Sequence, residues 1–103
     1  MKVRVVRSSR LSTHLRLCYR EDAKAVADFG GEVGDVALRH WRRTSTIWVG
    51  LGERRACVPH IVRTAAAAGA RKAVACGRRS VALVLSGVET GHAAALEGVL
   101  LGT

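Results

Sequence analysis

Hydrophobic and polar residues alternate in two stretches near the start of the chain. The segment MKVRVV places Val3 and Val5 between basic residues, and residues 12–20 repeat the alternation with Leu15, Leu17 and Tyr19. A period of two is typical of a β-strand with one buried face. The pattern therefore predicts strands over residues 1–6 and 12–20.

The middle of the chain carries one short helix signal and one strong strand signal. Residues 21–29 predict a helix that begins with Glu21 and Asp22, whose charges suit a helix N-terminus, and that ends at Gly30. Residues 36–43 have an ambiguous pattern that is compatible with a third strand. Residues 46–51, TIWVGL, are rich in β-branched and aromatic side chains and predict a central strand.

The second half of the chain predicts a helix, a buried strand and a second helix. Pro59 suits the first turn of a helix, which we expect to run to Cys76, before Gly77. Its small residues lie on one face, and the other face carries His60, Arg63, Thr64, Ala67 and Arg71. Residues 80–85 form an apolar run typical of a strand covered on both sides, and residues 90–101 predict the last helix. This βαβα order predicts parallel strands and an α/β fold.

Composition limits the chain to a small protein of one domain, residues 1–103. Its 103 residues are 49% hydrophobic, and no run reaches the roughly 18 apolar residues of a membrane span. The first ten residues show no apolar segment of a signal peptide, so we expect a cytoplasmic protein with no membrane partner.

The net charge of +9 suggests attraction to a polyanion such as nucleic acid. The hypothesis places binding along the exposed side of the long helix and at its start, on Arg54, Arg55, Arg63 and Arg71. Other basic clusters are Arg39, Arg42 and Arg43, and Arg71, Lys72, Arg78 and Arg79. The alternative is compositional, because a GC-rich genome enriches Arg and Ala without a ligand. Aromatic residues are only 4%, so bases have few side chains on which to stack.

The second half resembles the N-terminal domain of the leucyl aminopeptidase family, peptidase family M17. The resemblance lies in residues 49–53, VGLGE, at a strand end, in the Ala- and Arg-rich helix, in SVALVL at 80–85 and in AALEGVLLG at 94–102. It covers about half of the chain, and the first half carries no diagnostic motif. It implies a macro-domain-like sandwich, with a mixed, partly parallel sheet flanked by helices.

The resemblance does not imply peptidase activity. The family's metal ligands lie in a separate C-terminal domain, around an Asn-Thr-Asp-Ala-Glu-Gly-Arg segment. This chain contains no Asn and ends where the linker to that domain would begin, so we expect no metal, no cofactor and no catalytic residue carried over. The three cysteines, Cys18, Cys57 and Cys76, have no C-x-x-C spacing, which argues against zinc and against a disulfide framework.

Two loops follow predicted parallel strands and could form a small-molecule site at the same sheet edge. The candidate ligand-binding residues are Gly50, Gly52, Ser86 and Gly87, since ligands of open α/β sheets bind at the carboxyl ends of strands. Acid–base chemistry there would use Glu53, Glu89 and His92. The simpler interpretation is that these are solvated loop and helix-cap residues.

The last predicted helix is apolar on nearly every side. A helix of this kind is normally buried all round, and a small sheet covers only one face of it. We therefore expect Leu96, Val99, Leu100 and Leu101 to contribute to an interface with a second copy or with a partner protein.

Three hypotheses for function remain. The first is a non-catalytic, stand-alone aminopeptidase N-domain that acts in assembly or binding. The second is a small enzyme, for instance of secondary metabolism, that reuses this scaffold with a site at the carboxyl ends of the strands. The third is a non-specific nucleic-acid-binding module, since some bacterial members of the resembling family bind DNA.

Overall fold

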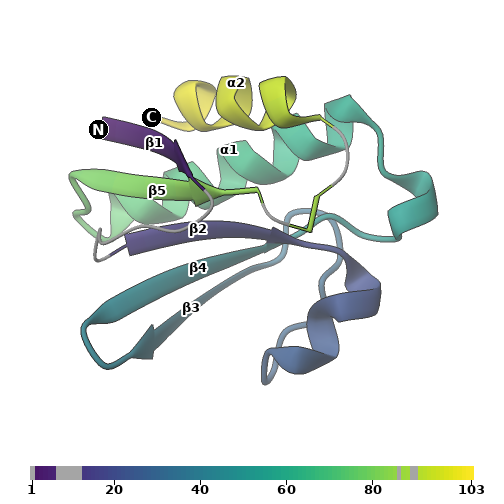
Figure 1. The fold of residues 1–103 in the computed structure, drawn as a ribbon, viewed down its shortest axis with the longest axis horizontal. Helices are drawn as coiled ribbons and strands as arrows, with labels where there is room; N and C mark the ends of the chain where they lie inside the picture. The colour runs from purple at the N-terminus through teal and green to yellow at the C-terminus, as the bar shows by residue number, and fades with distance from the viewer. Residues whose placement is uncertain (1, 7–12, 86, 89–90) are drawn as a thin grey trace.

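A single five-stranded sheet organises the molecule (Figure 1). The computed structural model describes residues 2–6, 13–85, 87–88 and 91–103. The strand order is β1-β5-β2-β4-β3, in which β3 runs antiparallel to β4 and every other neighbouring pair is parallel. The strands are β1 (Lys2–Val6), β2 (Thr13–Cys18), β3 (Val36–Trp41), β4 (Thr44–Gly50) and β5 (Ser80–Val84).

The strand signals in the sequence are confirmed, and the ambiguous segment 36–43 contributes the strand β3 as far as Trp41. In β2, Leu15 and Leu17 are buried while His14 and Arg16 are half-buried, as a period of two requires. In β5, Val81, Ala82, Leu83 and Val84 are all buried, so this strand is covered on both faces as predicted.

The two strands that precede and follow the long helix are not neighbours in the sheet. The strands β4 and β5 are parallel, but β2 lies between them and pairs with both. The connection through the long helix therefore passes over β2. The middle of the sheet is β2, although β4 is also an interior strand.

The helices are α1 (Pro59–Ala75) and α2 (His92–Gly102), with 3₁₀ turns η1 (Arg20–Ala25) and η2 (Arg54–Ala56). The predicted small-residue face of α1 lies close against the sheet. A Cβ on Gly69 would come within 2.6 Å of a Val49 methyl group and 2.8 Å of a Leu15 methyl group. No described helix is both long enough and apolar enough to span a membrane.

The helix α2 lies alongside α1 and corrects one predicted exposure. Ala67 was expected on the solvent face of α1, but it is buried because α2 passes over it. A Cβ on Gly102 would lie 2.5 Å from the Ala67 carbonyl oxygen, and a Cβ on Gly98 would overlap the Arg63 carbonyl oxygen. Small residues on both helices thus allow their backbones to approach closely.

The predicted helix over residues 21–29 is instead a 3₁₀ helix that ends at Ala25. Buried residues in and just after this turn recur every three positions, at Ala23, Val26 and Phe29. A period of three is that of a 3₁₀ helix rather than of an α-helix. These three residues form a second small core with Cys18 and Ala37. The main core lies on the other side of the sheet, beneath α1 and α2.

Candidate functional site

The glycine loop after β4 is occupied by contacts within the chain. The backbone N–H of Gly50 donates to the Asp35 carbonyl, that of Leu51 to Cys18 and that of Gly52 to Gly31. An anion in this loop would need those three donors. The candidate ligand-binding glycines Gly50 and Gly52 therefore serve the packing of the loop at residues 31–35 against the end of β4.

The second predicted loop is described only in part. Ser86, Glu89 and Thr90 lie outside the described residues, whereas Gly87 is exposed with a φ of +86°. His92, at the start of α2, is exposed, and its Nε2 lies 2.6 Å from the Val88 carbonyl oxygen. The residues that the structure describes enclose no pocket.

Acidic and basic groups at this edge hold the two 3₁₀ turns together. Arg20 donates to the Glu53 carboxylate at 2.7 Å and lies 3.5 Å from Glu32. Arg54 pairs with Asp22 at 3.1 Å. The candidate acid–base residue Glu53 is thus an exposed partner of Arg20.

Glu21 and Tyr19 fix the position of Arg54 still further. The Glu21 carboxylate accepts the Arg54 backbone N–H at 3.0 and 3.2 Å, and this hydrogen bond lowers the pKa of Glu21. The Arg54 guanidinium stacks over the Tyr19 ring, 4.6 Å from its centre. These contacts connect η1 to η2. They give the charged side chains a structural role at the carboxyl edge, by which we mean the end of the sheet where the parallel strands terminate.

The four arginines assigned to polyanion binding do not form one free surface. Arg54 is held at the carboxyl edge as described above. Arg63 pairs through its Nε with Glu97 of α2 at 3.1 Å. Arg55 and Arg71 are both exposed. Two of the four charges are therefore already balanced within the chain.

A different set of arginines gathers where the parallel strands begin. We call Arg42, Arg43, Arg78 and Arg79 the basic edge. His14 of β2 pairs with Thr46 of β4 and with Ala82 of β5, so these three residues form one row across the sheet. Arg43 and Arg79 each precede that row by three residues. They lie two strands apart, about 10 Å between backbones at the usual strand spacing. Arg78 Nη2 donates to Ser45 Oγ at 3.3 Å, which joins the start of β4 to the turn before β5.

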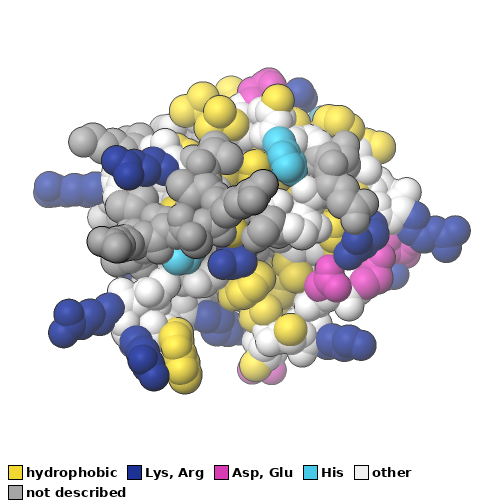
Figure 2. Space-filling view, in the orientation of Figure 1, with side chains coloured by type: hydrophobic (Ala, Val, Ile, Leu, Met, Phe, Trp, Pro, Cys, Tyr) yellow, Lys and Arg dark blue, Asp and Glu magenta, His cyan; other side chains and the backbone are white. Residues whose placement is uncertain are grey.

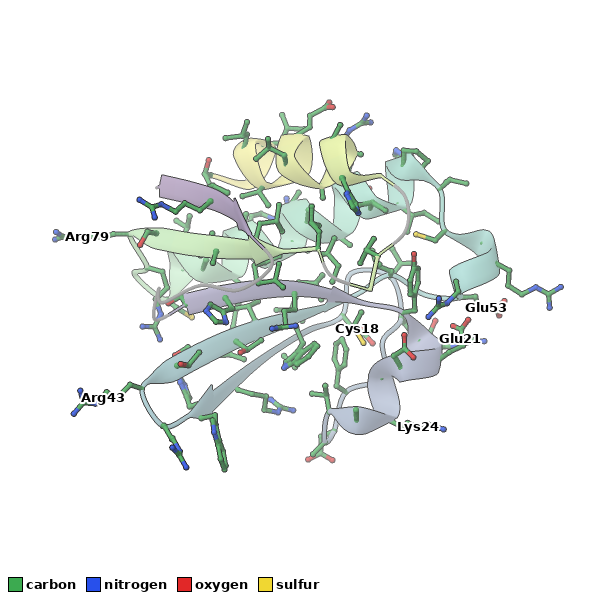
Figure 3. All side chains as sticks on the ribbon, in the orientation of Figure 1. Cys18, Glu21, Lys24, Arg43, Glu53 and Arg79 are labelled. Carbon is green, nitrogen blue, oxygen red and sulfur yellow. The ribbon has the colours of Figure 1, made fainter. Side chains whose placement is uncertain are left out.

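One end of the molecule carries arginines without paired carboxylates among the described residues, whereas the other end carries acidic side chains together with Arg20 and Arg54. Figure 3 shows Arg43 and Arg79 projecting from one end, and Glu21 and Glu53 lying at the other. The space-filling view shows acidic side chains grouped toward the carboxyl edge, with Lys and Arg side chains beside them as well as at the opposite end (Figure 2). Between residues 36 and 88 the only acidic residue is Glu53. Among the described residues, no carboxylate forms an ion pair with the basic edge.

A tryptophan stands beside the basic edge at the tip of the β3–β4 hairpin. Trp41 pairs with Thr44, so only Arg42 and Arg43 form the turn. The side chain of Trp41 is 74% exposed, and the Arg42 guanidinium lies 5.7 Å from its ring centre. The sequence pattern does not single out Trp41, because the turn contains none of the Gly or Asn residues that mark a two-residue hairpin.

The helix α2 has two clearly different sides. Ala94, Ala95, Gly98 and Val99 are buried against the chain's own core. The prediction that Val99 contributes to an interface is therefore wrong, since Val99 is fully buried within the monomer. The opposite side exposes three large apolar side chains, Leu96 (37%), Leu100 (60%) and Leu101 (69%), which we call the leucine stripe.

The cysteines are free and differ in environment. Cys18 is buried, Cys57 half-buried and Cys76 exposed. Burial raises the pKa of the Cys18 and Cys57 thiols, and the Asp22 carboxylate adds to the effect at Cys18. The described ranges bring together no group of three or more His, Cys, Asp or Glu side chains suited to a metal.

Comparison with models of known protein families gives no match, and comparison with curated protein sequences gives none either. Function is therefore inferred from two surfaces of the molecule, the leucine stripe and the basic edge with Trp41.

Proposed function

We propose that the chain is a non-catalytic binding module, resembling the N-terminal domain of leucyl aminopeptidases, that assembles with a second copy through α2. The observation that supports this proposal is the leucine stripe. Leu96 and Leu100 are four residues apart and so share one face of the helix, with Leu101 beside them. The described residues offer no observation that favours the alternative of a small enzyme.

The charge on this face is compatible with self-association. The acidic residue between the leucines, Glu97, pairs with Arg63 of the same chain. A second copy would therefore meet a surface that is apolar and locally balanced in charge. Two copies of one stripe, related by a two-fold axis, are self-complementary by construction.

We expect the protein to sediment as a dimer or larger species at micromolar concentration. The double variant Leu100→Ser, Leu101→Ser should shift it to a monomer, because it removes two exposed apolar side chains from the interface without disturbing the buried side of α2. The matched control is Val74→Ser, which changes a half-exposed apolar residue on α1. A wild-type protein that stays monomeric over the same range contradicts the proposal.

A second candidate function, binding of a polyanion, is favoured by the basic edge, whose arginines form no ion pair with a described carboxylate. The basic edge places four guanidinium groups at one end of the molecule, where no described carboxylate neutralises them. Neutralisation of phosphates by such groups releases counterions, and affinity then depends steeply on salt. This surface differs from the α1 arginines that the sequence analysis selected.

We expect a duplex DNA to bind at low ionic strength and to lose affinity by orders of magnitude between about 50 and 200 mM salt. The variant Arg43→Ala, Arg79→Ala should weaken binding to two unrelated duplexes equally. The charge-matched variant Arg55→Ala, Arg71→Ala should weaken it less. If the second variant has the larger effect, the polyanion lies along α1 instead. If neither duplex binds at the lower salt concentration, the basic charge is compositional.

A further inference from the structure

The exposure of Trp41 is the feature that the functions above leave unexplained. An indole ring is among the largest apolar surfaces that a residue offers, and Trp is seldom left in water without a partner. Trp41 is 74% exposed, more than any other large apolar side chain that the structure describes. It lies on β3, at the edge of the sheet.

The residues around Trp41 are cations and hydroxyls. Arg42 stacks against the ring, and Thr44 is its cross-strand partner. Arg39 precedes Trp41 by two positions and so lies on the same face of β3, where its Nη2 donates to the Ala27 carbonyl at 2.6 Å. An exposed ring with one guanidinium group against it and a second arginine next to it in the turn is an arrangement that suits a planar, anionic ligand.

The backbone at Arg42 adds a second, independent observation. Arg42 has a φ of +57°, in the left-handed region that favours Gly or Asn at this position of a hairpin turn. An Arg at such a position carries backbone strain, and strain of this kind is concentrated at functional sites. The residue in this strained conformation, Arg42, is also the one whose guanidinium lies against the Trp41 ring.

Protection of an edge strand explains only part of this surface. Exposed edge strands are often kept from aggregating by charged side chains, and Arg39 and Arg43 would serve that purpose. An exposed Trp has the opposite effect, because its apolar ring promotes association at the edge of the sheet. The combination therefore calls for a ligand that uses the ring.

We propose that Trp41 and the exposed arginines of the basic edge bind single-stranded nucleic acid, with one base stacked on the exposed indole and adjacent phosphates held by Arg43 and Arg79. This inference rests on the second candidate function, polyanion binding, and names its ligand. Single strands expose the faces of their bases, whereas a duplex keeps them stacked on one another. A stacking side chain accordingly favours a single strand over a duplex of equal charge.

An anionic membrane surface is the competing ligand, and the described residues favour it less. A protein that docks on a membrane inserts several apolar side chains between the headgroups, with cations around them. Trp41 is the only large apolar side chain of the described hairpin that is exposed. Its neighbours in the turn, Arg42 and Arg43, are both charged.

The test compares three anions of similar charge: one exposes its bases, one keeps them stacked in a duplex, and one has no bases. A dye-labelled twelve-nucleotide oligothymidylate, a hairpin duplex with the same number of phosphates and inorganic polyphosphate are titrated with the wild-type protein at low salt. Trp41→Ala should weaken binding of the oligothymidylate by about tenfold or more, as removal of a stacking ring does. It should leave polyphosphate binding nearly unchanged. Trp41→Phe should restore most of the lost affinity.

Two further variants separate the stacking ring from the charges. Arg43→Ala, Arg79→Ala should weaken binding of all three anions, while Lys24→Ala at the opposite end should weaken none. Arg42→Gly should raise the melting temperature, because Gly relieves the strained φ. It should nevertheless weaken binding of the oligothymidylate. Because Trp41 is largely outside the core, its replacement should leave the far-ultraviolet circular dichroism unchanged.

Each outcome bears on a different part of the argument. If all three anions bind but Trp41→Ala weakens them equally or not at all, the stacking inference is wrong and polyanion binding stands. If none binds at low salt, polyanion binding itself is wrong. Preferential binding of anionic phospholipid vesicles, lost in Trp41→Ala, overturns the nucleic-acid proposal in favour of a membrane surface.

Discussion

Gly50→Ala should lower the free energy of unfolding by about 3 kcal/mol, at the upper end of what overpacking of a core costs. A Cβ on Gly50 would overlap the Glu32 carbonyl oxygen and lie 2.5 Å from the Gly31 carbonyl carbon. Both contacts are with backbone, which has no rotamer that relieves them. The φ of Gly50 is not positive, so the loss would come from the steric overlap alone.

A small domain has little stability to lose, so this substitution should be visible in urea denaturation followed by tryptophan fluorescence. The matched control is Gly30→Ala. Its φ is also not positive, and its added Cβ would meet only the Asp35 carboxylate, at 3.3 Å. We expect a change within about 0.5 kcal/mol there. Equal effects at the two positions would contradict the close packing of the loop at residues 31–35 on the end of β4.

The elements with strong local signals were predictable from the sequence. Pro59 and Gly77 bracket α1, and the apolar run at 80–85 identifies a strand buried on both faces; these signals depend on residues close together in the chain. The pairing of β2 between β4 and β5 was not predictable in this way. Strand order is set by contacts between residues distant in sequence, and no local pattern encodes it.

The candidate site was less predictable than the fold, for physical reasons that differ from residue to residue. Val99 looks like its neighbours Leu100 and Leu101 in sequence, and only the position of α1 decides which of them is buried. Arg54 and Arg63 look like free charges until η1 and α2 bring Asp22 and Glu97 to them. The register of three strands brings Arg43 and Arg79 together across 36 positions of sequence.

The contact between α1 and α2 determines which side of α2 faces solvent, and Gly98 is central to it. An added Cβ at Gly98 would overlap the Arg63 carbonyl oxygen and lie 3.0 Å from Ala66 Cβ. The helices are held together by small residues on both, so α2 would have to move away from α1 to make room. Such a shift would loosen the packing of Val99 and Ala95, which are fully buried.

Gly98→Ala should therefore destabilise the protein by about 2 kcal/mol, although Ala is a better helix former than Gly by about 1 kcal/mol. The sign of the effect is the test, because helix propensity and packing predict opposite directions. Ala93→Gly, on the exposed side of the first turn of the same helix, changes propensity without packing and should cost less than the roughly 1 kcal/mol of a helix interior. Urea denaturation of both variants gives the comparison. A Gly98→Ala protein more stable than the wild type would mean that α2 does not pack closely on α1, and the leucine stripe would lose its defined orientation.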